Sequence, residues 1–158
     1  MNLFRLVLFT FFGLLVQHRT QAQVKTTYVL TQESCKKIAA ASIKYAVDNA
    51  APGGSIAIVD AGGHLLYLER MDNTFAQAAE VSYEKARTAA LFKKDTKAFE
   101  DNINSGRVAL TTVGPVMLQG GLLIVYKGEV IGAIGVSGTK SADQDTDVAK
   151  VGIAVKLD

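Results

Sequence analysis

The sequence predicts an α+β domain in which helices surround an antiparallel sheet. Two pairs of apolar, β-type segments are each joined by a short turn that contains glycine, which is the pattern of a hairpin. Segments with helical periodicity come before, between and after these pairs, and helices grouped around hairpins give an α+β architecture. With 158 residues, 49% of them hydrophobic, the chain has the length of one domain, which we place at residues 23–158.

The first helix is predicted to begin after Thr31, a typical N-cap residue, and to end before Pro52. Its apolar and small residues recur at spacings of three and four: Cys35, Ile38, Ser42, Tyr45 and Ala46. Cys35 lies on the apolar side of this helix, so we expect a buried and unreactive thiol.

The two hairpins follow from strand-like runs around glycine turns. The first pairs Ser55–Asp60 with His64–Arg70, and the second pairs Leu122–Tyr126 with Glu129–Ser137. The last of these strands contains Gly132 and Gly135. Because glycine weakens a strand, its repeated use indicates that another group approaches the backbone closely there.

Two helices are predicted between the hairpins: Phe75–Phe92, and Asp95–Ile103 with Phe99 on its apolar side. Mostly small residues form a stripe that would let the longer helix lie close against the sheet: Ala79, Ser82 with Tyr83, Ala86 and Ala90. Val108–Gln119 is apolar but interrupted by Gly114-Pro115, so its structure stays open. A final helix is predicted to begin after Ser141, an N-cap residue.

Residues 1–22 are predicted to be an export signal. Arg5 precedes the apolar run Leu6–Val16, which is too short for a membrane span of about 20 residues. Small residues before the end of this segment predict cleavage after Ala22, and the alternative is an uncleaved amphipathic helix. We expect an exported chain, periplasmic or secreted, with no stable membrane anchor after cleavage.

Composition and motifs exclude several classes of protein. The formal net charge is +2, so there is no basic excess of the kind that binds nucleic acid. One cysteine cannot close a disulfide within the chain. Neither a nucleophile elbow nor a dinucleotide-binding glycine motif occurs.

Four segments, in this order and spacing, resemble the GlcG/HbpS family: Asp60-Ala61-Gly62-Gly63, Glu69-Arg70-Met71-Asp72, Glu84 to Ala89, and Gly128 to Gly138. That family includes extracellular haem-binding proteins and the C-terminal domain of the PduO cobalamin adenosyltransferase. The resemblance covers about residues 30–156. It implies a profilin-like domain, with a five-stranded antiparallel sheet flanked by helices, that forms homo-oligomers. Secreted members carry a signal peptide and bind haem, some with a role in haem breakdown or iron sequestration.

A haem site needs an apolar slot, iron ligands and a cation for the propionates. Arg70 and Lys85 are the candidate cations, and their alternative is a surface charge pair with Asp72 or Glu84. The other candidate haem contacts are Met71, Phe92, Thr112, Met117, Gly120 and Gly121. For the two methionines, the alternative is a place in the core.

The iron ligand stays open. His64 is the only histidine after Ala22, but its position behind two glycines favours a solvated turn residue. In a haem-binding relative, ligation is associated with a hydroxyl just before the paired glycines. Pro115 stands at that position here and cannot ligate, while Thr111 and Thr112 are nearby.

Glu80 and Glu84 are four residues apart on the predicted long helix, so both carboxylates face the same side. Two such groups could hold iron or another hard cation, and the pair is similar to an iron-binding feature of secreted relatives. The alternative is a solvated face on which Glu84 pairs with Arg87 or Thr88.

The resemblance, the export signal and the candidate residues together predict an exported, oligomeric haem-binding protein. Its ligand would lie between the long helix and the glycine-rich hairpin, at a subunit contact; iron and a corrinoid are the other ligands considered. One alternative is an enzyme that degrades haem or acts on a small organic acid. The other is a ligand-free accessory subunit whose glycines serve subunit packing.

Overall fold

The computed structural model describes residues 26–157, and the predicted export signal lies outside this range. The elements, in chain order, are α2 (Gln32–Asp48), β1 (Ser55–Asp60), β2 (Leu65–Arg70), α3 (Ala78–Phe92), α4 (Lys97–Asn104), the 3-10 helix η2 (Val108–Val113), β3 (Gly121–Tyr126), β4 (Glu129–Ser137) and α5 (Ala142–Ile153). This order confirms the predicted α+β class. No helix among these residues is long and apolar enough to cross a membrane.

Two helix starts follow directly from the sequence. The hydroxyl of Thr31 accepts a hydrogen bond from the backbone N–H of Ser34 at 3.1 Å. The hydroxyl of Ser141 accepts one from Gln144, also at 3.1 Å. Each bond satisfies a donor that the first helical turn leaves free, so both predicted N-caps are confirmed.

The sheet has the strand order β2-β1-β4-β3, and every neighbouring pair is antiparallel. The five strands implied by the family resemblance are wrong for residues 26–157, where the sheet has four. The segment Val108–Gln119, whose structure the sequence left open, begins as η2 and then runs without regular structure to β3. Gly114 has a left-handed φ of 86°, and Pro115 has no N–H to give to a strand partner.

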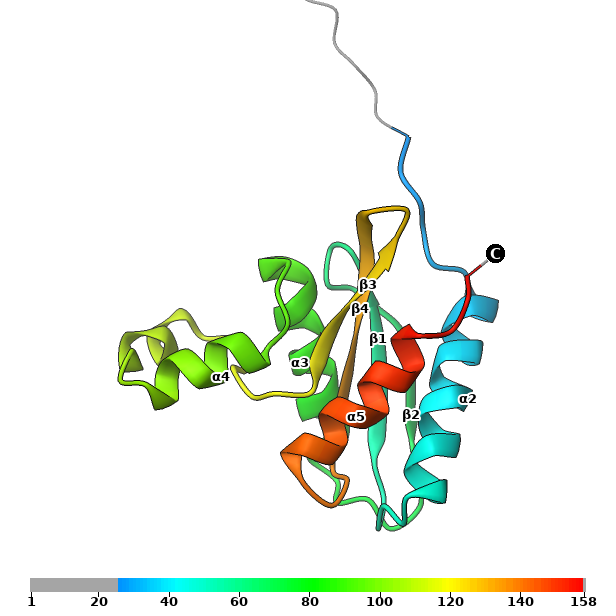
Figure 1. The fold of residues 1–158 in the computed structure, drawn as a ribbon, viewed down its shortest axis with the longest axis horizontal. Coiled ribbons are helices and arrows are strands. Elements are labelled where there is room, and N and C mark those ends of the chain that lie inside the picture. The colour runs from blue at the N-terminus through cyan, green and yellow to red at the C-terminus, as the bar shows by residue number, and fades with distance from the viewer. Residues whose placement is uncertain (1–25, 158) are drawn as a thin grey trace, which may run out of the picture.

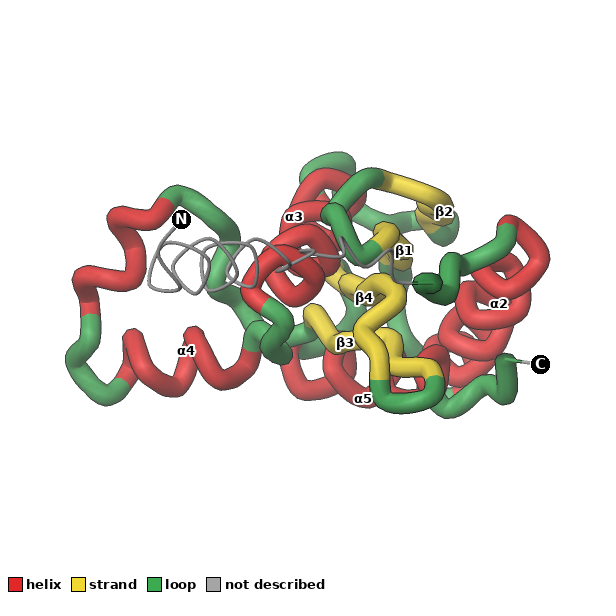
Figure 2. Tube along the Cα trace, turned by 90° about the horizontal axis from the view of Figure 1, so that it is seen from above, coloured by secondary structure: helices red, strands yellow, loops and turns green. Residues whose placement is uncertain are grey.

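Helices cover both faces of the sheet: α2 and α5 on one, and α3 on the other (Figures 1 and 2). Strand β4 supplies both layers because its side chains alternate. Ile134 and Val136 pack with α2 and α5, and Ala133 packs with the alanines of α3. Cys35 is fully buried in the α2 layer, where burial raises the pKa of its thiol.

The close approach predicted from the two glycines is made by α3 at Gly135, whereas a Cβ on Gly132 would overlap the carbonyl oxygen of Val59 in β1. A Cβ on Gly135 would overlap the carbonyl oxygen of Ser82 and lie 2.5 Å from the backbone nitrogen of Ala86. Helix α3 can come this near because the residues that it buries include Ser82, Ala86 and Ala90. The glycine of β4 and the small residues of α3 therefore serve packing within the chain.

Helix α4, η2 and the segment that follows them project from the side of the sheet (Figures 1 and 2). We call residues 97–118 the arm. Phe99 is the only buried residue of α4, and η2 has none. Most side chains of the arm therefore lie outside the core, and the arm holds two of the candidate haem contacts, Thr112 and Met117.

Candidate functional site

The base of the arm carries a pair of aromatic rings. Phe92, the last residue of α3, meets Phe99 of α4 edge to face, with 5.3 Å between ring centroids. Phe99 is 8% exposed, whereas Phe92 is 44% exposed. The buried ring thus supports a second ring that presents an apolar surface to solvent.

A hollow of about 300 Å³ lies on the arm between α4 and the segment after η2. We call it the arm hollow, and it is lined by Glu100, Ile103, Asn104, Thr111, Pro115, Met117 and Leu118. The Glu100 carboxylate accepts a hydrogen bond of 2.7 Å from the backbone N–H of Gln119, which fixes the returning segment to α4.

Two predicted haem contacts lie at or beside this hollow. Met117 lines it while being only 7% exposed, so it belongs both to the hollow and to the packing of the arm. Thr112 is exposed on η2 next to the lining residue Thr111. Its hydroxyl donates to the carbonyl oxygen of Ala109 at 2.8 Å, which leaves the oxygen lone pairs free to accept or to ligate.

Lys85 lies elsewhere, in the interior. It is 3% exposed, and its Nζ donates at 2.9 Å both to Asp145 Oδ2 and to the carbonyl oxygen of Val136. A surface pair with Asp72 or Glu84 is therefore wrong for Lys85. The other Asp145 oxygen accepts from the backbone and the hydroxyl of Thr139 at 3.1 and 2.7 Å.

Gly120 and Gly121 lie at the start of β3, next to the buried pair of Lys85 and Asp145. Gly120 has a φ of 110°, and a Cβ there would stand 2.8 Å from the carbonyl oxygen of Val136. A Cβ on Gly121 would overlap the carbonyl oxygen of Lys85. Both glycines thus serve the contact between β3, β4 and α3.

Arg70 and Met71 lie at the opposite edge of the sheet from β3. Arg70 ends β2 and pairs in register with Ser55, while Gly121 opens β3. Three strand spacings separate the two edges, which is about 14 Å. The structure therefore does not bring Arg70 and Met71 together with the residues of the arm.

Glu80 and Glu84, the two candidate metal ligands, both lie on α3, and no third ligand joins them among residues 26–157. The Glu84 carboxylate is 4.0 Å from the Arg87 guanidinium, with a quarter of its side chain exposed, as the alternative interpretation expects. Glu80 is exposed. Among residues 26–157, no cluster of three or more histidine, cysteine or acidic side chains could hold a metal ion.

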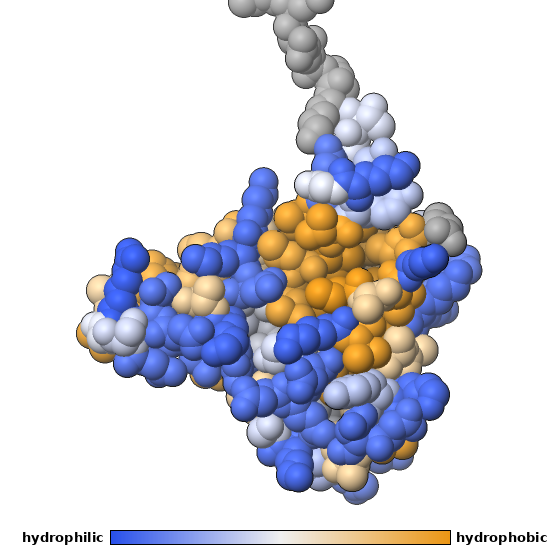
Figure 3. All heavy atoms as spheres, in the orientation of Figure 1, coloured by the Kyte–Doolittle hydropathy of each residue, from blue (hydrophilic) through white to orange (hydrophobic). Residues whose placement is uncertain are grey.

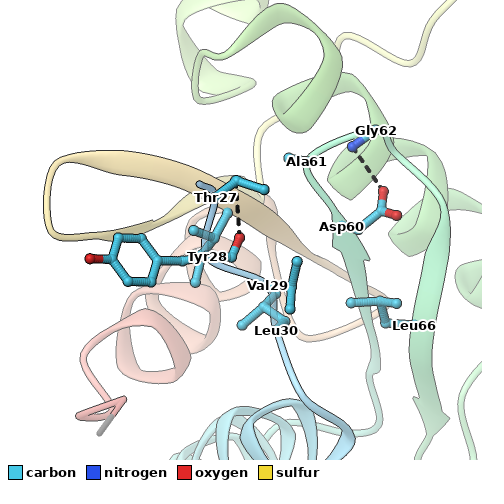
Figure 4. Close-up of a pocket in the computed structure, with 9 residues that line it drawn as sticks. Thr27, Tyr28, Val29, Leu30, Asp60, Ala61, Gly62 and Leu66 are labelled. Atoms are coloured by element: carbon cyan, nitrogen blue, oxygen red, sulfur yellow. Dashed lines mark hydrogen bonds between the residues drawn. The ribbon is translucent and has the colours of Figure 1, made fainter. Parts of the chain in front are cut away.

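A second hollow, of about 250 Å³, lies between the segment Thr27–Leu30 and the β1–β2 turn (Figure 4). We call it the turn hollow. Leu30 and Leu66 line it with apolar side chains, and Asp60 points toward Gly62 at its rim. The His64 ring lies beside this rim, with its Nδ1 3.1 Å from Asp60 Oδ2 and its side chain 81% exposed.

His64 thus occupies the solvated turn position that the sequence favours. The Asp60 carboxylate also accepts backbone hydrogen bonds from Gly62 at 2.8 Å and from His64 at 2.9 Å. Partial burial acts to raise the pKa of Asp60, but the bonds from His64 and Gly62 outweigh it and hold that pKa below its usual value.

We expect the contribution of Asp60 to stability to depend on pH. Its pKa is lower in the folded than in the unfolded chain, so the ionised carboxylate stabilises the fold above the unfolded pKa of about 4. That contribution is lost as the pH falls through the folded value. Urea unfolding of Asp60→Asn and of the unaltered chain should therefore differ at neutral pH and converge in acid. A difference that stays constant with pH would contradict the assignment.

Sequence reasoning gave no site role to Phe99 or Lys94, and the alternative it offered for Lys85, a surface pair with Asp72 or Glu84, is wrong because Lys85 pairs with Asp145. Lys94 Nζ lies 5.8 Å from the Phe99 ring centroid, at the base of the arm. Phe92, Lys93 and Lys94 are adjacent in the chain, and this run of an aromatic residue and two lysines could have indicated a site at the base of the arm. No local pattern indicates the pairing of Lys85 with Asp145, because the two residues are 60 positions apart.

Comparison with known proteins agrees with the family resemblance. The family model described as haem degrading protein HbpS-like matches residues 30–154. Protein GlcG of Escherichia coli (strain K12) is 46% identical over 116 residues, which cover 72% of this chain and 85% of GlcG.

Two solved structures share the fold over most of their length. A double mutant of HbpS from Streptomyces reticuli aligns with a TM-score of 0.76 and 27% identity, covering 90% of this chain and 99% of that one. The PduOC:heme complex aligns with a TM-score of 0.73 and 26% identity, covering 80% and 94%. The resemblance found in the sequence is confirmed, and the chain belongs to the HbpS-like family.

Proposed function

We propose that this chain binds haem on the arm. The observation that carries the proposal is the half-exposed Phe92 ring, held on the buried Phe99 ring of α4. The same helix lines the arm hollow, to which Met117 and Pro115 also contribute. Flat apolar ligands are held by such surfaces when a few polar groups fix their orientation. Support comes from a relative in this family that was solved as a haem complex.

The residues of the arm, together with Phe92 at its base, fit the needs of a porphyrin better than those of a bare metal ion. Phe92 supplies a face for stacking, and Met117 supplies an apolar and polarizable wall. The Thr111 and Thr112 hydroxyls donate to backbone carbonyl oxygens at 2.8 Å and keep oxygen lone pairs for a ligand. When bound, haem would supply the redox chemistry of its iron, while these side chains would hold and orient it.

We also propose that the chain is exported and that it self-associates. Export rests on the predicted signal in residues 1–22. Self-association is supported by exposed apolar side chains outside the arm, such as Val125 of β3, 54% exposed, and Ile153 of α5, 38% exposed. Figure 3 shows an apolar patch over β3, β4 and α5, the kind of surface that marks a contact with another protein. Turnover of haem or of a small organic acid stays a prediction from the sequence.

The test is a haemin titration of residues 23–158 followed by visible absorbance. We expect a saturable, sharpened Soret band, and we expect Phe92→Ala to weaken binding by about 10-fold or more, because one buried aromatic contact contributes about 1.5–3 kcal/mol. Phe75→Ala is the matched control, since Phe75 is 58% exposed and lies before α3, at the other end of that helix from Phe92 and the arm.

Either of two results would overturn this assignment. A Soret band that matches free haemin would remove haem binding. Equal affinity of the Phe92 and Phe75 variants would leave haem binding intact but move the site away from the arm.

A further inference from the structure

Two adjacent lysines stand at the junction between α3 and the arm. Helix α3 ends at Phe92, and Lys93 follows in the left-handed conformation, with φ 50° and ψ 43°. Glycine is favoured at this position because it has no Cβ. A lysine is found there instead, and Lys94 follows it; both side chains are exposed.

The junction that carries these lysines is fixed to the start of β3. The backbone N–H of Thr96 donates to the Gly121 carbonyl oxygen at 2.9 Å. The Gly121 N–H donates to the Thr96 hydroxyl, also at 2.9 Å. Asp95 accepts a bond of 2.9 Å from the Leu123 N–H. The backbone of the junction is therefore held before any ligand arrives, which lowers the entropic cost of binding.

The positive charge of the two lysines is not neutralised within residues 26–157. Lys97, the next lysine along the chain, pairs with Asp101 at 2.7 Å, whereas neither Lys93 nor Lys94 has an ion pair with an acidic side chain in that range. The adjacent acid, Asp95, faces Leu123. The junction thus offers two cations next to an exposed aromatic ring.

We propose that Lys93 and Lys94 form a carboxylate-binding site that receives the acidic edge of a planar ligand lying on Phe92. The inference rests on the proposed function and specifies its ligand class as tetrapyrroles with two carboxylate side chains. Ammonium groups make charge-assisted hydrogen bonds with carboxylates. Because this recognition uses the carboxylates, it does not require iron. The site supplies the propionate cation that Lys85, buried against Asp145, does not present.

The experiment uses metal-free protoporphyrin and its dimethyl ester, each titrated into residues 23–158 by porphyrin fluorescence. The two ligands share the ring and differ in the carboxylates. We expect the diacid to bind about 10-fold more tightly than the ester, and Lys93→Met with Lys94→Met to remove that difference while leaving ester affinity unchanged. The preference should also weaken with added salt.

Lys36→Met with Lys44→Met is the matched control, because it removes the same charge from exposed positions on α2. It should keep the preference for the diacid. Arg70→Met, which removes the other predicted cation, should keep it as well.

The outcomes separate this inference from the proposed function. If haemin binds but the diacid and the ester bind equally, the carboxylate site is overturned and haem binding stands. The carboxylate site is also overturned, and haem binding stands, if Arg70→Met abolishes the preference for the diacid while Lys93→Met with Lys94→Met keeps it. If neither haemin nor either porphyrin binds, the proposed function fails and the inference fails with it.

Discussion

Lys85→Met is expected to lower the free energy of unfolding by about 3–5 kcal/mol, because it leaves the Asp145 carboxylate charged and unpaired in the interior. The side chains of this pair are 4% and 7% exposed, so water cannot replace the lost partner. The pair also ties α3 to α5 and to the carbonyl oxygen of Val136. Urea unfolding followed by circular dichroism would measure the loss.

Two further variants show whether the loss comes from the uncompensated charge. Lys85→Met combined with Asp145→Asn should recover much of the stability, because the asparagine is neutral and can still accept from Thr139. Lys44→Met breaks a pair whose side chains are 75% and 54% exposed, and it should cost less than about 0.5 kcal/mol. If the single and double variants were equally unstable, the loss would have to be explained by packing.

Gly135→Ala is expected to cost about 3 kcal/mol or more, because overpacking is expensive where neither side can move. The new Cβ would overlap the Ser82 carbonyl oxygen and crowd the Ala86 nitrogen, both of them backbone atoms of α3. The helix would have to move away from β4, and the alanine contacts on that face of the sheet would be lost. Thermal unfolding of the variant would measure this effect.

Gly128→Ala is the control that separates the clash with α3 from the backbone strain of replacing a glycine. Gly128 has a φ of 81° in the β3–β4 turn, and a Cβ there would meet nothing within 4 Å. Its substitution should therefore cost only the backbone strain of about 1 kcal/mol. Equal losses for the two variants would contradict the close contact between Gly135 and α3.

The strands and helices of the sheet layers were predictable because local patterns determine them. Ser55–Asp60 and Glu129–Ser137 form strands with the predicted bounds, since glycine turns limit them and their residues form nearly continuous apolar runs rich in valine and isoleucine. The segment Val108–Gln119 was not predictable. Its apolar residues lie on a 3-10 turn and around a hollow of the arm, so they follow neither helical nor strand periodicity.

The candidate site was predictable only in part, for a related reason. Phe92 and Met117 could be picked out as apolar candidates, but whether they share a surface depends on how α4 folds back. Lys85 looked like a surface cation because its neighbours in the chain are charged. Its burial depends on Asp145 and on the carbonyl oxygen of Val136, which only the tertiary structure brings to it.

The arm also bears on how this fold can diversify. Most arm side chains contribute nothing to the core, since α4 buries Phe99 alone and η2 buries none of its residues. Substitutions there carry little penalty in folding, in contrast to the positions where α3 meets β4. If the arm is the binding site proposed above, natural selection can alter its ligand while the sheet and its helices stay constant, and members of one family can keep this framework while differing in what they bind.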